Sequence, residues 1–184
     1  MDAGIILLIL VIGIGIFLVM VYNRLVALRQ TCNQAWGDID VQLKQRHDLV
    51  PNIVETVKGY AAHERELFAE ITEKRAQALA AGDDLASRGA AESALSQPVA
   101  RLMAVAEDYP DMKASGNFLE LQKELAETED KIEMARRFYN GAVRELNTSV
   151  QSFPANLLAG PLGFRQRAYF EVDMADRALP EIDM

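Results

Sequence analysis

Cysteine and histidine are scarce in this chain of 184 residues, and each scarcity excludes a class of site. The one cysteine, Cys32, can form neither an intramolecular disulfide nor a metal site built from several cysteines. The two histidines, His47 and His63, lie sixteen residues apart, so a histidine metal site would also need distant carboxylates. We therefore expect both histidines to face solvent, and we predict no metal and no cofactor.

Recognisable catalytic sequences are also absent. The chain has no glycine-rich phosphate loop and no Gly-x-Ser-x-Gly elbow, and Leu67 stands where a zinc protease beginning at His63-Glu64 needs its second histidine. Five carboxylates could still form a cation site or an acid–base pair: Asp38, Asp40, Asp48, Glu55 and Glu64. Structural roles are favoured, because Asp48 can cap a helix and Asp40 precedes Lys44 by four residues. The sequence thus predicts no catalytic residues and no enzyme.

Positive charge is in deficit, with 19 basic against 27 acidic residues and a formal net charge of −8. This balance argues against nucleic-acid binding. Charge is missing altogether from Ala3 to Tyr22, a mostly apolar run of 20 residues. As a helix the run spans about 30 Å, the thickness of a bilayer's hydrocarbon core. A basic start and a small-residue cleavage site are both lacking, so we predict a transmembrane anchor over residues 1–22 rather than a cleaved signal peptide.

The residues that follow the anchor predict its orientation. Tyr22, Asn23 and Arg24 are types that favour the membrane–water interface, and we predict that they mark the membrane boundary. Arg24 and Arg29 follow the apolar run, whereas no basic residue precedes it. The positive-inside rule then places the rest of the chain in the cytoplasm.

Residues 23–152 show helical periodicity and no strand-like alternation, which predicts an all-α antiparallel bundle of long helices continuing from the anchor. The first helix is expected to end at Asp48, before Pro51, and a second to stop near Gly82. A loop is expected over residues 83–90.

A third and a fourth helix complete the expected bundle. Pro110 closes the third helix, and Pro98 either kinks it or marks a start near Ser96; the sequence leaves both open. The fourth begins near Asn117 and ends at Pro154, and an unbroken stripe with spacings of three and four indicates a long core or coiled-coil face. The stripe consists of Phe118, Leu121, Leu125, Thr128, Ile132, Ala135, Tyr139, Ala142, Leu146, Ser149 and Phe153.

Residues 153–184 are rich in proline, glycine and aromatic residues, and we expect them to form an irregular tail that packs on the bundle or on a neighbouring copy. Its aromatic residues Phe164, Tyr169 and Phe170 are candidate contacts in a homo-oligomer.

Several ordered blocks of the sequence resemble the LemA family of bacterial membrane proteins. The strongest block runs from Ala35-Trp36-Gly37 to Gly59-Tyr60-Ala61. Further blocks are Tyr109-Pro110-Asp111 with Lys113-Ala114, Phe118 with Leu121-Gln122 and Glu124-Leu125, Ala135 to Asn140, Phe153-Pro154, and Gly163-Phe164. Two positions depart from the family pattern: His47, where the family usually has an aromatic residue, and Pro98, where it normally continues a helix.

The resemblance implies a single-pass protein of the bacterial inner membrane, with a helical-bundle domain and no established enzymatic activity. One branch of the family works in building magnetosome membranes, so membrane organisation is the expected activity. We predict a self-assembling scaffold of more than two copies, with parallel transmembrane helices. The alternative is a membrane-tethered adaptor or regulator that presents the bundle to an envelope protease or signalling partner.

Overall fold

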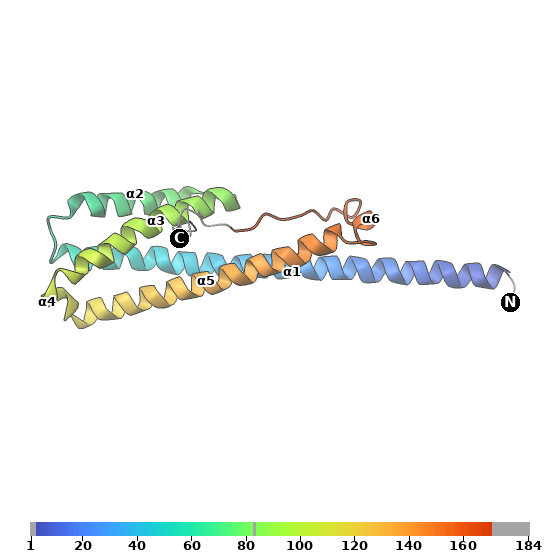
Figure 1. Cartoon of the computed structure of the whole chain (residues 1–184), viewed down its shortest axis with the longest axis horizontal. Helices are drawn as coiled ribbons and strands as arrows, with labels where there is room; N and C mark the ends of the chain where they lie inside the picture. The colour runs from blue at the N-terminus through green and yellow to red at the C-terminus, as the bar shows by residue number, and fades with distance from the viewer. Residues whose placement is uncertain (1–2, 83, 171–184) are drawn as a thin grey trace, which may run out of the picture. The chain divides into compact units, whose positions relative to one another are not determined.

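Residues 3–82 and 84–170 are described by the computed structural model, and every secondary-structure element within them is helical, as predicted. The elements are α1 (Ala3–Lys58), α2 (Arg65–Ala80), α3 (Leu85–Glu107), α4 (Pro110–Lys113), α5 (Gly116–Gln151) and α6 (Asn156–Ala159) (Figure 1). The far end of the predicted C-terminal tail, residues 171–184, lies outside the described residues.

Two compact units make up the chain. The anchor-side unit comprises Met1–Asp38 and Ala135–Ala168, and the bundle unit comprises Ile39–Met134 and Tyr169–Met184. The helices α1 and α5 contribute to both units.

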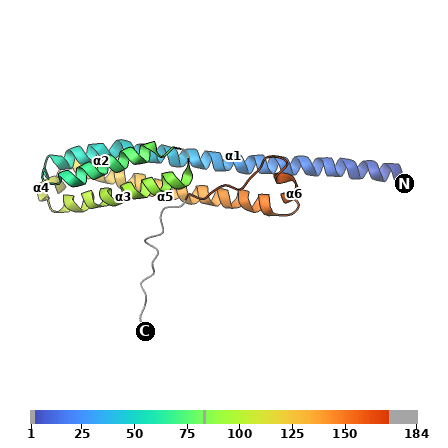
Figure 2. The ribbon, with the colours of Figure 1, turned by 90° about the horizontal axis from the view of Figure 1, so that it is seen from above.

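In the bundle unit, segments of α1, α2, α3 and α5 lie side by side, and successive long helices run in opposite directions (Figures 1 and 2). Each segment presents apolar residues at helical spacing to one continuous core, so most of the predicted stripe positions in this unit are buried. The core residues are Val50, Ile53, Val54, Val57, Ala61, Leu67, Phe68, Ile71, Leu95, Val99, Leu102, Ala106, Met112, Phe118 and Leu125. The prediction of an antiparallel bundle is confirmed.

The predicted end of the first helix at Asp48 is wrong, because α1 continues through Pro51 to Lys58. Proline lacks the amide hydrogen that would bond to the carbonyl four residues earlier, which here belongs to His47. Arg75 of α2 replaces that donor: its Nε donates to the His47 carbonyl oxygen at 2.7 Å. The helix therefore keeps its course past the proline, and Asp48 is an exposed residue within it rather than a cap.

The third helix also starts earlier than the sequence predicts. It begins at Leu85 and runs continuously past Pro98, so the expected loop over residues 83–90 and the alternative start near Ser96 are both wrong. Asp84 caps it: the side chain accepts a hydrogen bond from the Ser87 amide at 2.8 Å. A hydrogen bond from the Ser87 side chain, together with the one from its amide, lowers the pKa of the Asp84 carboxyl.

In the anchor-side unit, α1 and α5 pack through a mixture of small and aromatic residues. Trp36 of α1 lies against Tyr139 of α5, with ring centroids 5.7 Å apart. After α6 the chain reverses at Gly163, whose φ of +75° is a conformation that favours glycine. The reversal lets the Phe164 amide bond to the Ala159 carbonyl at 2.8 Å and brings the Phe164 ring into a cluster with Leu25.

Candidate functional site

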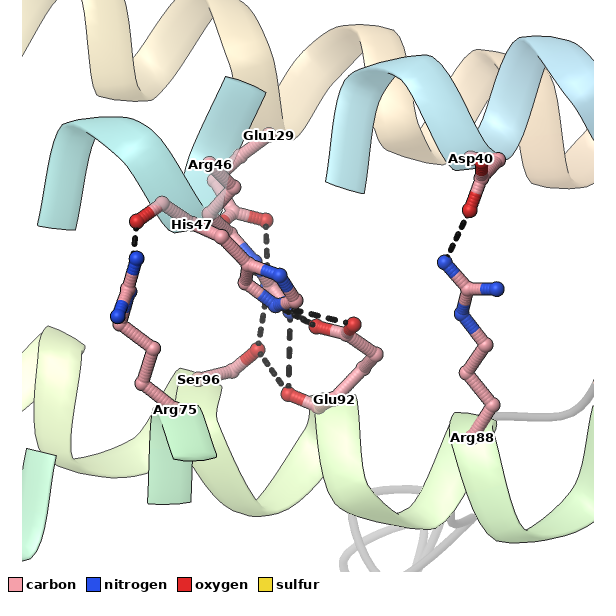
Figure 3. A network of polar contacts seen from close by, with 8 residues as sticks. All are labelled: Asp40, Arg46, His47, Arg75, Arg88, Glu92, Ser96 and Glu129. Atoms are coloured by element: carbon pink, nitrogen blue, oxygen red, sulfur yellow. Dashed lines mark hydrogen bonds and ion pairs between the residues drawn. The ribbon is translucent and has the colours of Figure 1, made fainter. Parts of the chain in front are cut away.

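A buried ionic cluster lies inside the bundle unit (Figure 3). Arg46 of α1 pairs with Glu92 of α3, and these side chains are only 3% and 4% exposed. The Arg46 guanidinium also donates to Ser96 Oγ at 3.0 Å and to Glu129 Oε1 of α5 at 3.1 Å. The Nε2 atom of His47 lies 3.1 Å from Glu92 Oε1. One arginine thus joins three helices.

The electrostatics of this cluster keep Glu92 ionised. Burial by itself raises the pKa of the Glu92 carboxyl, but the hydrogen bond to His47 and the charge of Arg46 outweigh burial and hold the pKa below its usual value. A buried charge without a partner would be strongly destabilising, so each member depends on the others. Since Arg46, His47 and Glu92 are almost inaccessible, the arrangement fixes helix register and offers no surface to a substrate.

The prediction that His47 faces solvent is wrong, because it is 4% exposed, whereas His63 is exposed as expected. The signal was present in the sequence: positions 46 and 47 continue the spacing of Ile39, Leu43 and Val50 and therefore fall on the core face of the helix. The burial of Glu92 was not predicted either, although Glu92 lies three residues before the buried Leu95 and therefore on the same face of its helix.

Of the five carboxylates considered as a cation or acid–base site, Asp40 and Glu55 form separate ion pairs. Asp40 pairs with Arg88 of α3 instead of Lys44, and Glu55 pairs with Lys58 at 2.6 Å. Asp38 and Asp48 are exposed on α1. Over residues 3–82 and 84–170, no group of three or more His, Cys, Asp or Glu side chains is arranged to hold a metal ion.

Cys32 and Tyr139 belong to the interior of the anchor-side unit. Burial raises the pKa of the Cys32 thiol, which is therefore protonated and unreactive at neutral pH. Burial also raises the pKa of Tyr139, whose hydroxyl donates to the Ala168 carbonyl at 3.2 Å. Nearby, Asn147 exchanges two backbone hydrogen bonds with Arg167, at 2.8 and 2.9 Å. These contacts secure the segment that follows α6.

The apolar start of α1 is exposed on all sides. Among the described residues it is the one segment long and apolar enough to cross a membrane, and none of it is buried within the chain. The predicted boundary residues Tyr22, Asn23 and Arg24 are exposed at the end of this segment. Of the candidate oligomer contacts, Tyr169 is 42% exposed, whereas Phe164 and Phe170 are buried within the chain.

An open cleft of about 650 Å³ lies beside this boundary. Val21, Arg24 and Leu28 of α1 form one wall, and the end of α5 forms the other. The residues on the α5 side, including the turn that follows it, are Arg144, Glu145, Thr148, Ser149, Ser152, Phe153, Pro154 and Ala155. The sequence did not indicate this cleft, because its two arginines are 120 residues apart along the chain.

Formal charge differs in sign between the units. The anchor-side unit contains seven basic residues, all of them arginine, against three acidic residues, which gives a charge of +4. The bundle unit contains 12 basic and 24 acidic residues and carries −12. The net charge of the whole chain therefore conceals a positive region next to the candidate membrane span.

These features define an all-α protein that joins a helical bundle to one candidate membrane span near its N-terminus. The sequence profile of the LemA family matches residues 35–184, and the chain belongs to that family.

Relatives carry two kinds of name. Magnetosome protein MamQ 2 of Paramagnetospirillum magneticum is 26% identical to this chain, in an alignment that covers 84% of the chain and 66% of the relative. Magnetosome protein MamQ of Magnetospirillum gryphiswaldense is 24% identical, with 83% and 65% covered. Protein LemA of Metamycoplasma hominis is 28% identical, with 91% and 78% covered. The chain thus spans slightly less than two thirds of the length of the magnetosome relatives.

Proposed function

We propose that this protein is a membrane-anchored, non-enzymatic helical scaffold that self-assembles and organises membrane or envelope components. The observation that carries the proposal is the exposed apolar segment of α1, which is continuous with the helix that builds both units. Such a surface needs lipid around it, since burying large apolar side chains stabilises by about 1.5–3 kcal/mol each. The relatives named as magnetosome proteins support a role in membrane organisation.

The proposed orientation places the anchor in the inner membrane of a bacterium, and the bundle unit and the rest of the anchor-side unit in the cytoplasm. Arg24 and Arg29, which follow shortly after the apolar run, support this orientation. Protease added outside intact cells should leave the bundle whole, and lysed cells are the control. Degradation of the bundle in intact cells would reverse the orientation without affecting the scaffold proposal.

Self-assembly is the part of the proposal that separates a scaffold from an adaptor. Light scattering of the full chain, in mild detergent and again after reconstitution into lipid, should give a mass of more than two copies. Tyr169→Ala should lower that mass if the exposed tail aromatic is a contact. A monomeric mass in both media would overturn the scaffold.

The alternative is a membrane-tethered adaptor or regulator that presents the bundle to an envelope protease or signalling partner. The acidic surface of the bundle unit favours it, because a charge of −12 would attract a basic protein surface. Co-purification of one protein in fixed ratio, lost at high salt, together with a monomeric or dimeric mass, would establish this alternative.

A further inference from the structure

The cleft beside the membrane boundary combines positive charge with apolar walls. Arg24 and Arg144 reach it from α1 and α5, and within residues 3–82 and 84–170 neither guanidinium forms an ion pair. Glu145 also lines the cleft, so the two arginines leave a net charge of +1 in it. Guanidinium groups bind phosphate oxygens through paired hydrogen bonds, which makes a phosphate the matching ligand.

The other cleft groups favour a lipid over a soluble phosphate. Val21 belongs to the apolar run, so one wall of the cleft is part of the predicted membrane span. On the opposite wall Phe153 is 79% exposed, although its place in the sequence stripe predicts burial. Ser152 Oγ donates to the Thr148 carbonyl at 2.7 Å, so its proton is already used within the chain.

Two more exposed apolar residues follow in the same unit. Leu157 is 65% exposed and Leu162 is 42% exposed, in and just after α6. Large apolar side chains gathered on a surface mark a contact with a membrane or with another protein. Here they accompany a positively charged unit and the end of an apolar span, and that combination matches an anionic membrane surface.

We propose that this cleft binds the phosphate of an anionic phospholipid through Arg24 and Arg144, with Phe153 set among the lipid acyl chains. The site goes beyond the scaffold function: it requires the membrane anchor but not self-assembly. A negative result here would therefore leave the oligomeric mass unchanged, and a monomeric protein would still bind the lipid.

Native mass spectrometry of the full chain in detergent tests the arginines. Titration with phosphatidylglycerol should give tighter binding than titration with phosphatidylcholine. Arg24→Gln with Arg144→Gln should weaken phosphatidylglycerol binding by about 25-fold, about fivefold for each arginine near a lipid surface. The matched control is Arg136→Gln with Arg165→Gln, which removes equal charge from the same unit outside the cleft and should change binding less than about twofold.

Several outcomes would overturn the site. Equal affinity for the two lipids would show that the cleft does not recognise the lipid's charge. A loss in the control pair equal to that in the cleft pair would show that the unit attracts the lipid only through its overall charge. Displacement of the lipid by inorganic phosphate at similar concentration would identify a soluble ligand instead. If circular dichroism shows that the glutamine pair is misfolded, the single changes Arg24→Gln and Arg144→Gln decide: each should weaken phosphatidylglycerol binding about fivefold, and unchanged affinity in both folded single variants would refute the site.

Fluorescence quenching tests the position of Phe153 independently. The chain has a single tryptophan, so Phe153→Trp in a Trp36→Phe background reports from this site alone. In vesicles whose acyl chains carry bromine, its emission should be quenched, whereas the control Met134→Trp in the bundle unit, at a site 60% exposed, should not be. Absence of quenching at position 153 refutes the insertion. If Phe153→Ser also lowered the oligomeric mass, a second copy would cover this surface in place of lipid.

Discussion

The bundle unit and the anchor-side unit use charged residues in opposite ways. The bundle unit places Arg46 and Glu92 in its interior, where each charge needs the other, and carries an excess of acidic residues. In the anchor-side unit no arginine is buried, and the seven together outnumber the carboxylates. One unit thus uses a buried ion pair to fix its fold, whereas the other leaves its arginines partly or fully exposed.

This difference explains how a chain of net charge −8 can suit a membrane. Anionic head groups repel a region of −12 and attract one of +4, and both forces fall off within a Debye length, about 8 Å at physiological salt. The overall charge argues against attraction to anionic lipid, but the local charge next to the span favours it. At the membrane surface, the sign of the charge close to the span determines whether anionic lipid attracts or repels the protein.

The largest expected effect comes from breaking the buried pair. Glu92→Ala leaves the Arg46 guanidinium in the interior without its principal partner, which should lower the free energy of unfolding by about 3–5 kcal/mol. Thermal unfolding of the full chain, followed by circular dichroism, measures the loss. The control is Asp40→Asn, which removes a partner from the more exposed Asp40–Arg88 pair and should cost about 1 kcal/mol or less. Similar losses for the two variants would mean that burial of the cluster does not determine its strength.

Truncation of the stripe on α5 should rank next. Leu125 and Ile132 are 6% and 8% exposed, and Leu125→Ala or Ile132→Ala should cost about 2–5 kcal/mol. Met134→Ala on the same helix removes a side chain that is 60% exposed and should leave the melting temperature nearly unchanged. If all three variants melted alike, the assignment of the buried face would be wrong.

Loss of the Arg75 hydrogen bond that replaces a helical one should have an intermediate effect on the free energy of unfolding. Arg75→Ala removes the donor to the His47 carbonyl and should cost about 1.5–3 kcal/mol, the range for hydrogen bonds to charged groups. Pro51→Ala restores the amide hydrogen that α1 lacks at position 51. In that background Arg75→Ala should cost much less, and a double-mutant cycle of unfolding free energies measures the coupling. Additive losses would show that the two residues act independently.

Acid should weaken the bundle unit through Glu92. Its pKa is held below the ordinary value of 4.5, so the stabilisation is complete above about pH 4.5 and is lost as the pH falls through the lower pKa of the folded state. Unfolding free energies between pH 6 and pH 3 should therefore fall less steeply in Glu92→Gln than in the wild type. Identical slopes would show that Glu92 does not contribute to acid sensitivity.

Local periodicity predicted the elements better than their ends. The stripe from Phe118 to Ser149 follows from spacing alone, and its ten members are all buried or partly buried. The continuation of α1 past Pro51 could not be predicted, because it depends on Arg75, a side chain that folding brings to the His47 carbonyl, which has no amide donor within the helix. The cleft was missed for a similar reason, since it requires Arg24 and Arg144 to approach each other in the folded chain.

The composition of the anchor-side unit makes its charge permanent. All seven of its basic residues are arginine, and all six lysines of the chain lie in the bundle unit. A guanidinium stays protonated across the physiological range, whereas lysine amines can be acetylated and lose their charge. Acetylating enzymes or amine-reactive reagents would make the bundle unit still more negative while the side-chain charge next to the membrane span stayed the same. Modification of lysines can thus change the charge of the bundle unit and leave the arginine charge beside the candidate span as it is.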